Sequence, residues 1–341
     1  MKKNTFFKVL GLFAFVLVTS FLLPEIYHHF FDVEGVTAFT AAAPLVTVFT
    51  KEIEEKLYPE SEFYHNAKDD SVWISGNKVS RGVAGASPGA STNPALPLSA
   101  TQRVDDSNEY AIQLHVTDPQ ILTRDEELIV NYNKRQSIID DHVNVLNTRT
   151  ADNMAYQWAP SNANYMIRTT GAGVAAVDGS QTGLRKAIEK QQFIEALIAL
   201  MRQDAKGPKF GVCPATLYGQ LLALPDFVDY TKTGRADILK TGVIGEILGI
   251  KMFVRSYTTL YTNAGTPVKK PVATAGAVDD NLSILIWDAT MCYKALGKVN
   301  VNIENRPATY LGDIINADVR SGGKSRADGK GVISIIQTPT A

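Results

Sequence analysis

Few residues in this chain have the types and spacing needed for covalent or metal chemistry. Cys213 and Cys292 lie in apolar segments, which predicts two buried thiols in preference to a disulfide. The histidines are His28, His29, His65, His115 and His142. No two of them have the i, i+4 spacing of a helical zinc site, and no cysteine lies near them. We therefore expect no catalytic residue, no cofactor and no metal site.

Two glycine patterns match part of a phosphate-binding loop but lack a glycine that the motif requires. Gly171-Ala172-Gly173 lacks the third glycine of a dinucleotide fingerprint, and no apolar strand leads into it. We interpret residues 171–183 as a linker. Gly323-Lys324-Ser325 ends like a P-loop, but the glycine required five residues before Gly323 is Asp318. We interpret the basic residues here as a solvated hairpin tip; they are Lys324, Arg326 and Lys330.

The composition predicts a folded protein without bulk positive charge. The 341 residues are 45% hydrophobic and 20% charged, and the formal net charge is −1. These values exclude global disorder. They also exclude nucleic-acid binding that depends on overall positive charge, so any contact with DNA should be weak and local.

The longest predicted element is a helix over residues 123–158, which would act as the spine of the molecule. Thr123 and Glu126 form a capping box, and Pro160 stops the helix. Its apolar face consists of Leu128, Tyr132, Ile139, Val143, Leu146, Met154 and Trp158. About 35 helical residues span roughly 50 Å, whereas a globular chain of this length has a radius of gyration of roughly 20 Å. The alternative is a break into two helices near residues 148–150.

The N-terminus carries an apolar run, Phe6–Leu23, after Lys2 and Lys3. Three interpretations compete: an export or membrane signal, an apolar helix that packs against partner subunits, and a removable prosegment. This segment by itself favours export. The charged residues that follow at 51–57 suit a short exposed helix, with Glu52 placed to pair with Lys56.

Residues 68–117 predict an extended hairpin. Ser71–Val79 and Asn108–Val116 alternate as strands do, and Arg81–Thr101 between them is rich in Gly, Pro and Ser. An isolated two-stranded hairpin is marginally stable in water. We therefore expect this hairpin to need a neighbouring subunit.

The segment after the spine helix predicts a mixed α/β core over about residues 183–296. Its predicted elements are an amphipathic helix Leu184–Met201, a buried strand Phe210–Cys213, a helix starting at Pro214, a turn or helix at Thr241–Ile250 followed by the strand Ile250–Val254, a strand Leu282–Trp287 and a short helix Asp288–Leu296. The tail predicts β-structure. Val299, Val301 and Ile303 alternate, as do Ile315, Ala317 and Val319; a polar turn at Ser321–Gly331 and a strand Val332–Ile336 would close a hairpin.

This order of parts resembles the major capsid proteins of tailed bacteriophages, which have the Hong Kong 97-type fold. The most specific segments are Phe210–Leu222, Gly242–Ile250 with the strand ending at Ser256, and Leu282–Trp287 with Ala289. The resemblance implies an α+β fold divided into an apolar N-terminal segment 1–45, an N-terminal arm 46–67, an extended loop 68–117, a peripheral domain 118–182 with 297–341, and an axial α/β domain 183–296.

The resemblance also implies a function. A major capsid protein assembles as hexamers and pentamers into an icosahedral shell that encloses viral double-stranded DNA. A portal, a scaffold and a maturation protease are partners in that family. The protein would then be part of the virion, assembled in the host cytoplasm and without stable membrane association. The alternatives are an encapsulin-like nanocompartment shell and an exported bacterial surface protein.

Six residues of the extended loop are predicted to contact neighbouring subunits. They are Trp73, Lys78, Arg81, Tyr110, Ile112 and Leu114.

Overall fold

The fold was analysed in a computed structural model. It describes residues 62–83, 89–90, 92–93, 100, 102–123, 134–177, 181–229, 242–274, 276–277, 279–304, 307, 309–310, 312–326 and 329–340. The predicted apolar segment 1–45, the helix at 51–57 and most of the arm 46–67 lie outside these residues, as does much of the loop tip. The fold is α+β, as predicted.

The central element is the helix α3, Lys134–Trp158. It runs without interruption through residues 148–150, so the alternative of two helices is wrong. It ends two residues before Pro160, as predicted, and the Lys269 ammonium donates to the carbonyls of Tyr156 and Ala159 at 3.0 and 2.9 Å. A cation at this end offsets the negative pole of the helix dipole.

The predicted helix start at Thr123 is wrong. Thr123 is the last residue of the strand β6, Gln120–Thr123, and residues 124–133 lie outside the described ranges. Strand β6 pairs with β16, Gly312–Ser325, and the pairing buries Leu122. Tertiary pairing therefore overrides the local capping signal.

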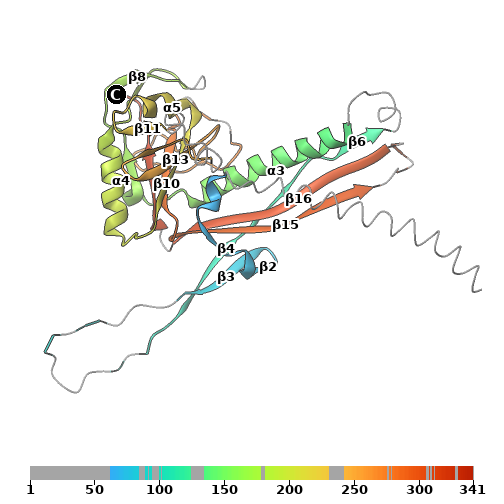
Figure 1. Ribbon diagram of the computed structural model, residues 1–341, viewed down its shortest axis with the longest axis horizontal. Coiled ribbons are helices and arrows are strands. Elements are labelled where there is room, and N and C mark those ends of the chain that lie inside the picture. Colours follow the sequence, from blue (N-terminus) through green and yellow to red (C-terminus); the bar gives the residue numbers. More distant parts are fainter. Residues whose placement is uncertain are drawn as a thin grey trace, which may run out of the picture.

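A long antiparallel ribbon lies against α3. It consists of β15, Cys292–Glu304, and β16, and Figure 1 shows the two strands running side by side along the helix. The core between helix and ribbon is made of Ile139, Val143, Leu146, Val299, Val301, Ile315, Ala317 and Val319. This packing confirms the alternation predicted for the tail.

The ribbon also overturns two predictions. Residues 292–296 are strand and not helix, because they pair with residues 321–325 of β16. For the same reason Ser321–Ser325 is strand and not a polar turn. The strand β17, Val332–Ile336, does not close a hairpin with β16; it lies between β14, Ser283–Asp288, and β7, Met166–Arg168.

Within the described ranges, seven strands form the second sheet, in the order β11-β12-β13-β10-β14-β17-β7. The strands not yet given are β10 Lys209–Pro214, β11 Phe227–Asp229, β12 Gly245–Ile247 and β13 Ile250–Arg255. Helices α4, Lys190–Arg202, and α5, Ala215–Leu222, cover one face of this sheet through one apolar cluster.

Local signals explain where these elements begin. Strand β10 leads into α5 at Pro214, which is the N-cap residue and not the first helical residue. Helix α4 begins at Lys190 and not at Leu184, because Glu189 and Gln192 form its capping box. Leu184–Lys186 is instead the strand β9, which pairs with β8, Gly173–Ala175, inside the predicted linker.

The glycine segment 242–250 forms a β-hairpin. Leu248 and Gly249 both have positive φ, 50° and 81°, and join β12 to β13 as a two-residue turn. Such turns match the twist of the flanking strands.

The sheet meets α3 and the start of the described chain at an aromatic cluster. Phe63, in the short helix η1 Phe63–His65, makes edge-to-face contacts with Trp158 and Trp287 at centroid distances of 5.7 Å. The Trp287 indole N–H donates to the carbonyl of Asn66 at 2.9 Å. Residues 62–66 are therefore wedged between the helix and the sheet. Cys213 and Cys292 are both buried free thiols, as predicted.

The extended hairpin starts from the ribbon. The 3-10 turn η2, Ser71–Trp73, and the strand β2, Ile74–Ser75, lead to β3, Lys78–Val83, which pairs with β4, Asp106–Ala111. The predicted strand Ser71–Val79 is thus divided in three. The predicted strand Asn108–Val116 is divided at Ile112, since β5, Gln113–Val116, pairs with β16. In Figure 1, β3 and β4 leave the body of the molecule.

Candidate subunit-contact surface

The root of the hairpin is fixed by ion pairs within the chain. Arg81 contacts Asp70 at 3.1 Å and lies over the Tyr293 ring at 5.2 Å from its centroid. Asp70 is 1% exposed. Burial raises the pKa of the Asp70 carboxyl, and Arg81 offsets only part of this increase. Arg81 therefore holds the hairpin against the ribbon of its own subunit.

Lys78 has a similar partner on the adjacent strand. Its ammonium lies 3.1 Å from the Glu109 carboxylate, which also accepts from the Ser80 hydroxyl at 3.0 Å. Hydrogen bonds from Lys78 and then Ser80 lower the pKa of Glu109. The pair is solvent-exposed, and such pairs stabilise a fold weakly. Lys78 remains accessible at the surface.

Two of the predicted contact residues turn toward their own chain. Ile112 is 5% exposed and packs with Val79 and Ala295. The Tyr110 ring packs against the same cluster, and burial raises the pKa of its hydroxyl. Their apolar surface is therefore used in anchoring the hairpin root.

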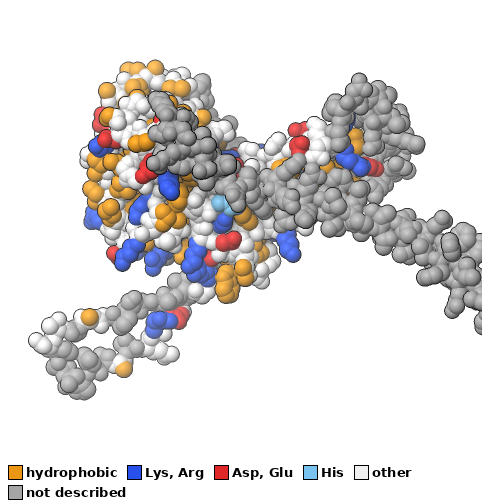
Figure 2. Space-filling model, viewed as in Figure 1, with side chains coloured by type: hydrophobic (Ala, Val, Ile, Leu, Met, Phe, Trp, Pro, Cys, Tyr) orange, Lys and Arg blue, Asp and Glu red, His pale blue; other side chains and the backbone are white. Residues whose placement is uncertain are grey.

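The remaining two predicted residues are exposed. The Trp73 side chain in η2 is 54% exposed next to Val72, and Leu114 in β5 is 48% exposed. Figure 2 shows hydrophobic side chains gathered where Figure 1 draws η2 and β2. Large exposed apolar side chains that cluster at one place are typical of interaction surfaces.

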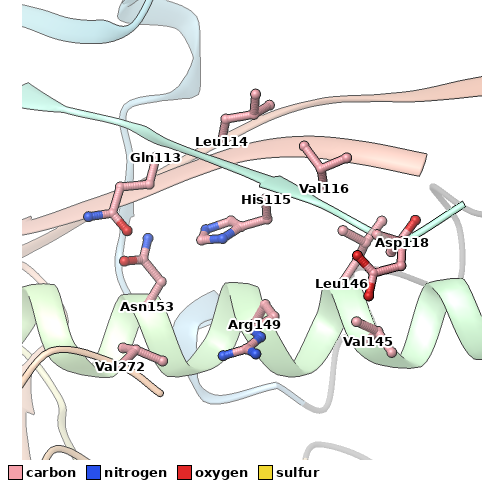
Figure 3. Close-up of a pocket in the computed structure, with 11 residues that line it drawn as sticks. Gln113, Leu114, His115, Val116, Asp118, Val145, Leu146, Arg149, Asn153 and Val272 are labelled. Atoms are coloured by element: carbon pink, nitrogen blue, oxygen red, sulfur yellow. The ribbon is translucent and has the colours of Figure 1, made fainter. Parts of the chain in front are cut away.

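A groove of about 400 Å³ lies between β5 and α3. Figure 3 shows Gln113 and His115 pointing from β5 toward the helix, and Leu114 and Val116 pointing away from it. His115 lies 3.0 Å from the Ser321 hydroxyl. Burial, and then the charge of Arg149, lowers the pKa of His115, which favours the neutral ring.

The groove carries an exposed cation, Arg149. Arg149 lines it from α3 (Figure 3) and makes no ion pair with any described residue. Asn153, one turn further along α3, donates to the Ser321 carbonyl at 3.3 Å. The sequence analysis missed this groove. The spacing of Val145, Arg149 and Asn153 would have placed all three on one helix face, but only pairing with β16 brings β5 opposite them.

No group of three His, Cys, Asp or Glu side chains within the described ranges is arranged to hold a metal ion. In the same residues no helix is long and apolar enough to cross a membrane. Lys324, placed by sequence in a hairpin tip, lies in β16 and donates to the Glu109 carbonyl at 3.0 Å.

The fold is shared with capsid proteins of known structure. The capsid of Ralstonia phage GP4 matches with a TM-score of 0.57 and 13% identity, over 81% of this chain and 88% of that one. The capsid of cyanophage P-SCSP1u matches with a TM-score of 0.55 and 13% identity, over 82% of this chain and 88% of that one. The capsid of an empty GTA particle matches with a TM-score of 0.52 and 11% identity, over 83% of this chain and 91% of that one.

No protein-family model and no curated protein matches the sequence. The structural matches cover most of the chain, and they establish that it has the Hong Kong 97-type fold of tailed-phage major capsid proteins. The domain boundaries and the six contact residues stay predictions.

Proposed function

We propose that this protein is the subunit of an icosahedral shell, assembled from many copies through hexamers and pentamers around viral double-stranded DNA. The extended hairpin carries this proposal. Its strands β3 and β4 leave the body (Figure 1), and the apolar cluster found among its described residues lies at the root, around Val79 and Ile112. A hairpin without its own core gains stability when another subunit covers it.

The contact surface that we propose combines Trp73, Lys78, Leu114 and the groove around Arg149. The two exposed apolar side chains supply area to bury. Arg149, which makes no ion pair with a described residue, can pair with an acidic residue of another copy. Since Arg81, Tyr110 and Ile112 are used within the subunit, their role is to hold the hairpin in position. The net charge of −1 suits a wall that encloses DNA without binding it tightly.

Shortening the hairpin tests this proposal. Replacing residues 84–105 by Asn-Gly keeps the pairing of β3 with β4 and supplies a favourable two-residue turn. We expect a soluble, folded subunit that forms no shells, measured by size-exclusion chromatography and negative-stain microscopy. The control is the unaltered full-length chain, which should form shells under the same conditions. Normal shells from the shortened chain would contradict the proposed role of the hairpin.

The contents of the shells decide what they enclose. Nuclease-protected DNA in purified particles supports a viral capsid, whereas co-purified enzymes would indicate a nanocompartment with the same fold. A stable monomer under all conditions would refute both. We propose no catalytic role for this chain.

A further inference from the structure

Among the described strands of the ribbon, the distal half of β15 is paired along one edge only. Strand β16 pairs with β15 on one side over residues 292–296 and 299–304, with a register shift between Leu296 and Val299. On the other side, β1, Lys68–Asp69, pairs only with Tyr293 and Lys294. From Lys298 to Glu304 no described strand lies beside β15 on the edge opposite β16 (Figure 1). These seven residues span about 23 Å, and such an open edge is a template for another strand.

The two faces of β15 define what a neighbouring strand must look like. Val299 and Val301 are buried against α3, while Lys298, Asn300 and Asn302 on the opposite face are exposed. A strand added to this edge would continue both faces. It would place alternate side chains beside α3, where apolar and β-branched residues fit best.

The described chain begins next to this edge. The side-chain amide of Asn147 donates to the Glu62 carboxylate at 3.3 Å. Val145 and Arg149 line the groove on the β5 side of α3. Asn147 is two residues from each of them, so its side chain points about 200° away from theirs around the helix axis. Glu62 therefore lies on the side of α3 that faces β15. Leu146, next to Asn147, packs in the cluster that contains Val299 and Val301, so Glu62 lies near the beginning of the open edge.

The sequence upstream of Glu62 contains a strand-forming segment. Residues 45–50 read Leu-Val-Thr-Val-Phe-Thr, which are β-branched or aromatic except for the first, and Pro44 precedes them. We propose that residues 45–50 add to β15 of the same chain as an antiparallel strand opposite Lys298–Glu304. Residues 51–61 connect this strand to Glu62, and eleven residues span up to about 36 Å. That length exceeds the open edge itself.

The antiparallel direction follows from the position of Glu62. The chain traced backward from Glu62 starts near Val299 and runs along the edge toward Glu304, so that residues 45–50 run opposite to β15. The apolar run Phe6–Leu23 then leaves the body at the distal end of the ribbon and not beside the seven-stranded sheet. The inference goes beyond the proposed function and does not depend on it.

Crosslinking tests the pairing and its origin. Neighbouring residues of a strand face opposite sides, so either Thr47→Cys or Val48→Cys must share a face with Asn300→Cys. The native Cys213 and Cys292 are buried and remain unreactive in the folded chain. With a short bis-maleimide we expect one of the two pairs to crosslink within a single chain. The matched control replaces Asn300→Cys by Leu114→Cys, which lies in β5 across β16 from β15 and is 48% exposed. Crosslinks only between chains, or equal yields with the control, would overturn the proposal.

Hydrogen exchange provides an independent measurement. We compare the full chain with chains that lack residues 1–44 or 1–50. Backbone amides of residues 298–304 that point away from β16 should exchange at the same rate in the full chain and after removal of 1–44, and roughly tenfold or more faster after removal of 1–50. Equal exchange in all three chains would refute the added strand.

Discussion

Truncation of Phe63 should destabilise the subunit strongly, although the residue lies at the very beginning of the described chain. Phe63 is 1% exposed and touches both Trp158 and Trp287 edge-to-face. A buried Phe→Ala change costs about 3–5 kcal/mol, from lost burial and the remaining cavity. A loss of about 4 kcal/mol lowers the ratio of folded to unfolded protein by roughly a thousandfold. We expect Phe63→Ala to reduce the unfolding free energy by this amount.

Urea denaturation of the unassembled subunit, followed by tryptophan fluorescence, measures this effect. The chain contains three tryptophans, and two of them touch Phe63, so the probe reports directly on the site. Trp73→Phe removes the exposed third fluorophore and serves as the common background. The control Val72→Ala truncates a side chain that is 89% exposed, and surface changes shift stability by at most about 0.5 kcal/mol. A Phe63→Ala loss no larger than the control would refute the wedge that residues 62–66 form.

Three further predictions concern the hairpin root, a turn and the groove. Burial raises the folded-state pKa of Asp70 above its ordinary value of 3.8. The protonated Asp70 carboxyl therefore stabilises the fold at pH values below 3.8, and this stabilisation is lost as the pH rises through the folded-state pKa. Urea denaturation at pH values from about 3 to 7 should therefore show the free energy of unfolding of the wild type falling relative to that of Asp70→Asn. A difference between the two free energies that does not change with pH would contradict the pKa shift. Gly331→Ala should cost roughly 2–4 kcal/mol, because φ is +87° and the new Cβ would overlap the Met291 side chain. Gly76→Ala, at positive φ but in open space, should cost only about 1 kcal/mol, and equal losses in urea melts would argue against the overlap. Arg149→Glu should leave urea stability unchanged within about 0.5 kcal/mol but lower shell yield in negative stain, whereas full yield would exclude the groove from the contact surface.

Several elements followed from the sequence because their signals are local. The apolar spacing up to Trp158 and the stop at Pro160 predicted the C-terminal part and end of α3. Alternation over Val299–Ile303 predicted the distal strand β15. The two cysteines were predicted to be buried because apolar residues surround them in the sequence.

Long-range pairing decided the rest. Residues 292–296 are strand because β16 pairs with them, and their sequence alone suited a helix. Ile112 alternates like a contact residue, yet the divided strand turns it toward Ala295. The groove around Arg149 exists only because residues about 200 positions apart, in β5 and β16, are hydrogen-bonded beneath α3. A residue's own neighbours set its local preference, but burial and the partner across a sheet contribute more free energy, and only the tertiary structure specifies them.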